Sequence, residues 1–219
     1  MRHIDESYLD MTHLVLLGDS IFDNAAYVEG GPAVIDHVRV AIDESSQAQL
    51  LAVDGNVTTD VLKQMRRVPP TATHLALSVG GNDALVGLNR LSGRAESILQ
   101  GLKVLSEIQA QFAASYLTTL DGLISLRLPL MVCTIYDQVP GLTPELQTAL
   151  SAFNDVIIRL AVQRRLPVLD LRQICNEASD YSTVSPIEPS ASGGKKIAKA
   201  LVDALARHPF DQGVCQIYG

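Results

Sequence analysis

The chain has 219 residues, of which 47% are apolar and 19% are charged, a composition typical of a globular domain and not of a disordered chain. Seventeen basic residues stand against 24 acidic ones, which gives a net charge of −7, and only 5% of the residues are aromatic. This balance argues against a nucleic-acid partner. No apolar run reaches 18 residues, so the sequence predicts no membrane span.

The three cysteines are Cys133, Cys175 and Cys215. An odd and widely spaced set fits neither a disulfide framework nor a Cys-x-x-Cys metal site, so we expect a reduced compartment and no metal. Residues 1–13 are mostly polar and lack the basic and then apolar order of a signal peptide. We therefore predict a cytoplasmic protein.

Five short apolar runs predict buried strands. They lack strict alternation, as expected of strands that are covered on both faces. The runs span residues 14–17, 49–53, 75–79, 130–135 and 167–171.

Helical patterns lie between these strands. Pro32 and Pro144 stand at first-turn positions, and Thr143 before Pro144 is a favourable cap. Strands that alternate with helices indicate an α/β fold with a parallel sheet, and the absence of linkers and repeats predicts a single domain over residues 1–219. The expected helices span residues 32–42, 58–67, 95–126, 144–165 and 190–207.

Three of the predicted strands end in short polar segments that contain glycine: Gly18-Asp19-Ser20, Gly55-Asn56 and Gly80-Gly81-Asn82-Asp83. Each alone is typical of a tight turn. In an open parallel sheet, however, the carboxyl ends of the strands form the ligand-binding edge. A serine hydroxyl, a glycine N–H and an asparagine amide together are the groups that acyl transfer needs, as nucleophile and oxyanion donors.

These three segments, in this order, resemble the motifs of the SGNH hydrolases, also called GDSL lipases and esterases. The resemblance covers nearly the whole chain. It implies that Ser20 is the nucleophile and that the backbone N–H groups of Ser20 and Gly55 and the side chain of Asn82 form the oxyanion hole. It also implies a cofactor-free enzyme for a small ester or acylated substrate. The implied fold is a flavodoxin-like three-layer sandwich with a five-stranded sheet in the order 2-1-3-4-5.

The chain departs from the family at the fourth motif, Asp-x-x-His. The matching segment is Ser185-Pro186-Ile187-Glu188, so Glu188 stands where the family has its basic His and Ser185 where it has Asp. The other histidines are poor substitutes. His13 and His74 open strands, His37 lies within a helix, and His208 follows a helix that carries it about 27 Å away. His3 has no predicted place.

Glu188 itself is therefore the candidate base. The ordinary pKa of Glu lies about 2 units below that of His, but burial beside Asp19 or Asp83 would raise it. In the family the Asp orients the His and fixes its tautomer. A carboxylate base needs no such partner, which is consistent with the presence of Ser185 where the family has Asp. In a second interpretation Glu188 only binds Ser20 or caps the last helix, and the protein is a silent binder of a small ligand. We expect Asp19, Asp83 and Ser185 to support the loops of the site.

Overall fold

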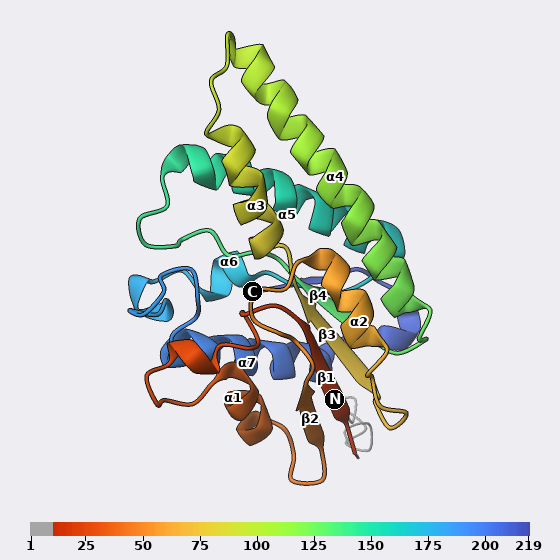
Figure 1. The fold of residues 1–219 in the computed structure, drawn as a ribbon. Helices are drawn as coiled ribbons and strands as arrows, with labels where there is room; N and C mark the ends of the chain where they lie inside the picture. The colour runs from red at the N-terminus through yellow and green to blue at the C-terminus, as the bar shows by residue number, and fades with distance from the viewer. Residues whose placement is uncertain (1–10) are drawn as a thin grey trace, which may run out of the picture.

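A computed structural model describes residues 11–219. Residues 1–10, which belong to the N-terminal segment judged above to lack a signal-peptide pattern, lie outside this range. The six strands form one parallel sheet in the order β2-β1-β3-β4-β5-β6 (Figure 1). The α/β class and the order 2-1-3-4-5 are confirmed. The strands are β1 (His13–Gly18), β2 (Gln47–Leu50), β3 (His74–Ser78), β4 (Leu130–Cys133), β5 (Val168–Leu169) and β6 (Ile217–Tyr218).

The predicted number of five strands is wrong by one. β6 has two residues and pairs with β5 through Val168 and Ile217, so its pattern is too short to recognise in the sequence. The second strand also lies two to three residues earlier than predicted, over Gln47–Leu50.

Helices cover both faces of the sheet. Leu14 and Leu16 of β1 pack in one core with α1 (Val34–Ala41), α6 (Leu171–Ile174) and α7 (Ala191–Arg207). The alternate residues Val15 and Leu17 pack in the other core with α2 (Val61–Met65), α4 (Ile98–Ile124) and α5 (Pro144–Arg164). Strands that are buried on both faces carry no polar alternation, which explains the continuous apolar runs. Single 3-10 turns span Ala25–Tyr27, Thr58–Asp60, Ala178–Asp180 and Phe210–Gln212.

The predicted helices follow their capping signals. The Thr143 side chain accepts a hydrogen bond from the Leu146 N–H, and Pro144 opens α5. Residues 58–67, predicted as one helix, divide into the 3-10 turn Thr58–Asp60 and α2.

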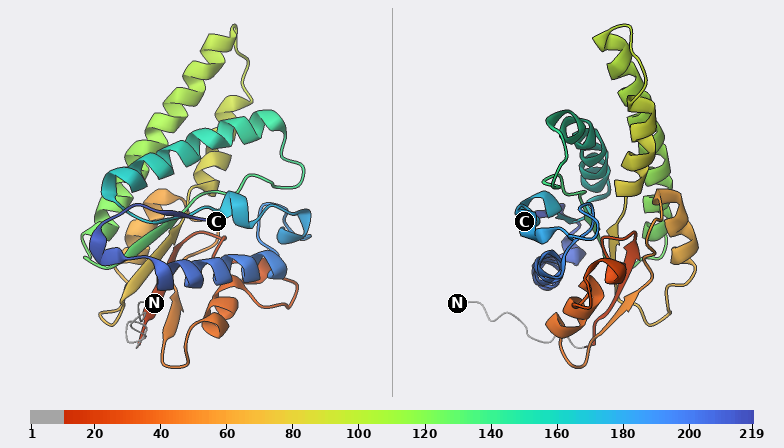
Figure 2. Two further views of the ribbon diagram at one scale, coloured as in Figure 1. Left: turned by 180° about the vertical axis from the view of Figure 1, so that it is seen from behind. Right: turned by 60° about the vertical axis from the view of Figure 1, so that its left-hand side comes forward.

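A helix that the sequence did not predict, α3 (Gly81–Leu91), precedes α4. Its glycine-rich start resembles a loop. Only Gly87 of this helix is fully buried, while Ala84 and Leu91 are partly buried and pack against the second core. The predicted helix 95–126 begins later, at Ile98, where the Ser97 side chain accepts from the Gln100 N–H. α3 and α4 form a hairpin that extends beyond the sheet (Figures 1 and 2). Within residues 11–219, no helix is both long and apolar enough to cross a bilayer.

Candidate active site

The turn after β1 positions Ser20. Gly18 has a φ of +129°, and a Cβ there would overlap the carbonyl oxygen of Ser78 on the neighbouring strand. Only glycine allows this close approach. The Asp19 N–H then donates to the same Ser78 oxygen at 3.1 Å. Ser20 is 5% exposed at the edge of the sheet.

Gln64 of α2 holds this turn from the side. Its Oε1 accepts from the Gly18 N–H at 2.8 Å, and its Nε2 donates to the Gly18 carbonyl at 2.7 Å and to Asn56 Oδ1 at 2.9 Å. The side chain is buried, so these bonds have little competition from water. Gln64 therefore fixes the turn that carries Ser20 relative to the turn after β2.

Asn82 lies at the start of α3, which begins after Gly80 at a φ of +128°. The Asn82 Nδ2 donates one hydrogen bond to the Asn56 carbonyl at 2.9 Å. An amide nitrogen has two hydrogens, so a second donor remains for a ligand. The first turn of a helix also favours negative charge through its unpaired N–H groups.

Gly55 and Asp83 lie at the same edge but outside the cavity described below. Gly55 has a φ of +76° and is exposed. The Asp83 Oδ2 accepts from both the N–H and the hydroxyl of Thr58 at 2.9 Å. Asp83 thereby joins α3 to the segment after β2.

Glu188 is held by the backbone of its own loop. Its N–H donates to the Ser185 carbonyl at 3.0 Å, and its carbonyl accepts from the Ser182 N–H at 2.8 Å. The Tyr136 hydroxyl donates to the Ile187 carbonyl at 2.7 Å. Ser185 thus contributes a carbonyl oxygen to the turn. The Glu188 side chain is 4% exposed, and its Oε2 has no hydrogen-bond partner within residues 11–219.

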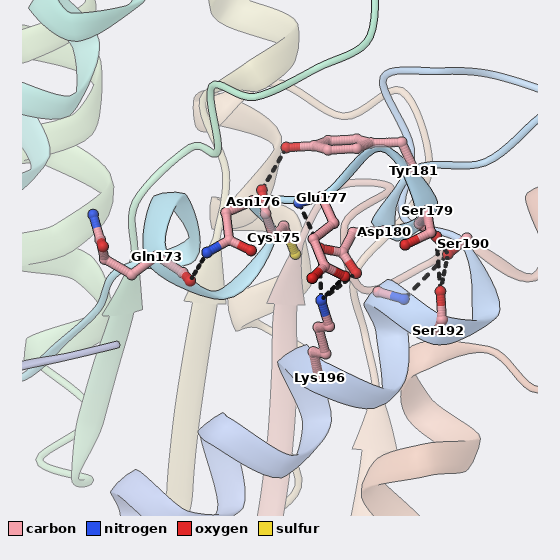
Figure 3. A network of polar contacts seen from close by, with 11 residues as sticks. Gln173, Cys175, Asn176, Glu177, Ser179, Asp180, Tyr181, Ser190, Ser192 and Lys196 are labelled. Atoms are coloured by element: carbon pink, nitrogen blue, oxygen red, sulfur yellow. Dashed lines mark hydrogen bonds and ion pairs between the residues drawn. The ribbon is translucent and has the colours of Figure 1, made fainter.

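A polar network anchors this loop to α7 (Figure 3). Lys196 binds Asp180 at 2.8 Å and Glu177 at 3.0 Å, while Ser190 donates to the Ser179 carbonyl at 2.7 Å. The Ser190 side chain also accepts from the Gly193 N–H and caps α7. The interpretation of Glu188 as the cap of the last helix is therefore wrong.

Asn24 connects the Ser20 turn to the Glu188 loop. Its Nδ2 donates to the Pro189 carbonyl at 3.0 Å, and its Oδ1 accepts from the Val34 N–H at 2.9 Å. The residue is fully buried. A displacement of either loop would leave a buried amide unpaired, which is costly, so the two loops are held in one arrangement.

Burial changes the acidity of two carboxyl groups at the site. Burial raises the pKa of Glu188 from its ordinary 4.5 to about 7, while the Ser20 hydroxyl lowers it and the charge of Asp54 adds to the rise. Within residues 11–219, the Glu188 Oε2 accepts no hydrogen bond, from Ser20 or from any other group. Burial raises the pKa of Asp19 to about 8. The hydrogen bond from the Ile21 N–H lowers this pKa, and the negative charges of Glu188 and Asp83 raise it further. Both groups therefore change charge near neutral pH.

Ser20 opens into an apolar cavity of about 130 Å³. Ser20, Asn82, Asp19 and Glu188 contribute to its polar part. The remainder is bounded by α3, α4, α5 and the segment after β4, through residues that include Leu88, Leu91, Ile108, Leu142, Leu146, Ala149, Leu150 and Phe153. The structure thus brings Ser20, Asn82 and Glu188 to one cavity, and leaves Gly55, Asp83 and Ser185 outside its lining.

None of the four described histidines lines this cavity. The His37 Nε2 bonds the Ala191 carbonyl at 2.9 Å between α1 and α7, and His208 packs edge-to-face on Phe210. His13 and His74 lie at the start of β1 and β3, at the opposite end of the strands. Residues 11–219 also contain no group of three or more His, Cys, Asp or Glu placed to bind a metal ion.

Sequence reasoning missed Gln64 and the cavity walls. Gln64 follows Val61 by three positions, so a polar residue on the buried face of α2 was the available signal. The leucines of α3 gave no signal of the cavity wall, because the sequence did not predict that helix.

No curated protein matches the sequence. Among solved structures, a lipase/acylhydrolase from Enterococcus faecalis has a TM-score of 0.67 and 20% identity, covering 90% of this chain and 96% of that one. The lipase Lip_vut3 from a goat rumen metagenome has a TM-score of 0.68 and 18% identity, covering 88% and 97%. The extracellular lipase from Streptomyces rimosus has a TM-score of 0.63 and 17% identity, covering 88% and 99%.

These likenesses show a shared fold. The GDSL-like lipase/acylhydrolase family matches residues 16–196, a span that includes Ser20, Gly55, Asn82 and Glu188. The chain therefore belongs to the GDSL-like lipase/acylhydrolase family.

Proposed function

We propose that the protein is a serine hydrolase of esters, with Ser20 as the nucleophile and Glu188 as the base. The observation that carries this proposal is that Ser20, Asn82 and the buried Glu188 line one cavity. Burial raises the pKa of the Glu188 carboxyl group to about 7. A base of this pKa is well matched to proton transfer near neutral pH.

The proposed reaction has two halves. Glu188 accepts the proton of Ser20 as its Oγ attacks the carbonyl carbon of the ester, and a tetrahedral oxyanion forms. When this intermediate collapses, the ester C–O bond breaks and the leaving alkoxide takes the proton from Glu188. Water then attacks the acyl-serine while Glu188 accepts a proton from it, and the proton returns to Ser20 as the acid departs.

The proposed oxyanion hole consists of Asn82 and the backbone N–H groups of Ser20 and Gly55. Within residues 11–219, these two N–H groups have no backbone or side-chain acceptor, and the Asn82 amide has its second hydrogen unused. The position of Asn82 at the start of α3 adds a favourable field for negative charge. Asp19, with a pKa of about 8, is mainly neutral at pH 7 and adds little repulsion there.

A second candidate function is binding of an acyl ligand without turnover. It is favoured by one observation, that the buried Glu188 Oε2 has no hydrogen-bond partner within residues 11–219. The motif match also predicts that Glu188 stands where the family has its histidine. The prediction of a cytoplasmic protein belongs to either function and is supported by three free cysteines, two of them buried.

A fluorophosphonate probe and short p-nitrophenyl esters test the proposal. We expect the probe to label wild-type protein at Ser20 and the esters to be hydrolysed, with both reactions lost in Ser20→Ala. Ser46→Ala is the matched control, because Ser46 lies before β2 at the other end of the sheet. Labelling of Ser20→Ala at the wild-type rate, or no labelling and no turnover in the wild type, would exclude the hydrolase.

A further inference from the structure

The wall of the cavity beside Ser20 has a consistent chemical character. Asp19, Ser20, Ser78, Asn82, Tyr136 and Glu188 are its polar residues, and all others are apolar or glycine. α3, α4 and α5 contribute no charged side chain to the lining. A sugar or another polar acyl group would lose hydrogen bonds to water there, whereas an alkyl chain would lose none.

The size of the cavity limits the length of such a chain. Its volume is about 130 Å³. An apolar protein cavity of roughly 150 Å³ holds benzene, which has six carbons. Along α3 the lining runs from Asn82 to Leu91, about 13 Å at the rise of a helix. The cavity is thus elongated and leads away from Ser20.

From these observations we propose that the cavity is an acyl-chain pocket for straight alkyl chains of about six to eight carbons. This inference rests on the proposed function and names its substrate class: medium-chain esters. The ester carbonyl lies at Ser20 and Asn82, and the chain runs between α3 and α5. Each buried methylene is worth about 0.8 kcal/mol, or about fourfold in affinity.

Two lining residues are proposed to set the chain length. Ala149 on α5 is a small residue among leucines, so a larger side chain there would occupy the space of the alkyl chain. Leu91 is the last residue of α3 and lines the cavity farthest along that helix from Asn82. Removing its side chain would extend the pocket. Both residues are half-buried, so the protein is expected to tolerate these changes.

The test measures binding separately from turnover. Straight-chain primary amides from acetamide to decanamide are neutral analogues of the ester carbonyl, and calorimetry gives their affinities for the wild-type protein. We expect affinity to rise on the order of 10²-fold from two to six carbons and to fall beyond eight. Ala149→Phe should move the optimum to four carbons or fewer, and Leu91→Ala should move it to longer chains. Ser151→Phe adds the same ring to the exposed side of α5, outside the lining, and should leave the profile unchanged.

Turnover of p-nitrophenyl esters from acetate to laurate then distinguishes the two proposals. Chain-dependent binding of amides without any turnover would support the pocket and refute the hydrolase. Turnover with equal kcat/KM for all chain lengths would support the hydrolase and overturn the pocket. A profile that Ala149→Phe and Ser151→Phe change alike would also overturn it.

Discussion

Replacement of Glu188 by Gln separates the chemistry of this carboxyl group from its effect on stability. Burial raises the folded-state pKa from 4.5 to about 7, so the folded protein binds this proton more tightly than the unfolded chain does. At 1.36 kcal/mol per pKa unit the shift corresponds to about 3 kcal/mol. The carboxyl group lines the cavity and is not enclosed in the closed core, so we expect a smaller effect of about 2 kcal/mol.

The difference in proton binding between the folded and unfolded states sets the direction in which stability changes with pH. Because the folded state holds more protons between pH 4.5 and 7, the contribution of Glu188 to stability falls as the pH rises through this window. Gln keeps the shape and carries no charge at any pH. Glu188→Gln should therefore be more stable than the wild type by about 2 kcal/mol at pH 8.5, or about 4–8 °C in Tm, and nearly equal to it at pH 4.

Calorimetric unfolding at the two pH values and initial ester hydrolysis rates from pH 5 to 9 provide the assay. Wild-type activity should rise with pH through about 7, as Glu188 ionises, and Glu188→Gln should be folded and inactive. Glu44→Gln, at an exposed glutamate, controls for the loss of one charge. Equal Tm values for wild type and Glu188→Gln at pH 8.5 would show that the buried Glu188 carboxylate does not destabilise the fold. Equal rates of ester hydrolysis would refute the role of Glu188 as the base.

Three further changes test other parts of the site. Asn82→Ala should lower kcat on the order of 10²–10³-fold with little change in Tm, and unchanged kcat would exclude Asn82 from the oxyanion hole. Gln64→Met should leave the buried N–H of Gly18 unpaired, while the Gly18 carbonyl keeps its bond from the Val53 N–H, and should lower the unfolding free energy by about 1–3 kcal/mol. An unchanged denaturant midpoint would show that the lost bond is replaced. Ser185→Asp combined with Glu188→His restores the family's pair, and hydrolysis rates at pH 8 should equal or exceed those of the wild type. Activity of this double variant alongside an inactive wild type would instead favour the ligand-binding function.

Much of the fold could be predicted because parallel strands and capped helices have strong local signals. Thr143 and Pro144 mark the start of α5, and the strand runs mark β1, β3 and β4. β6 has only two residues, and it is defined by its pairing with β5, which no local pattern records.

The site was predictable to the extent that turns after strands meet at one edge. Ser20, Asn82 and Glu188 come together for that reason. The walls of the cavity were not predictable, because α3, which contributes Leu85, Leu88 and Leu91 to them, begins with a glycine-rich segment that resembles a loop. Gln64 was missed since its partners are backbone groups of a distant turn.

The contrast between the Ser20 turn and α3 bears on how such a protein can diverge. Gly18 cannot acquire a side chain without displacing Ser78 from its strand. α3, in contrast, buries only Gly87 and exposes Leu85 and Val86. Substitutions at such exposed positions usually change stability by less than about 0.5 kcal/mol. Substitutions at the exposed positions of α3, of which Leu85 lines the cavity, can therefore reshape the pocket at little cost in stability, whereas the turn that carries Ser20 tolerates no side chain at Gly18.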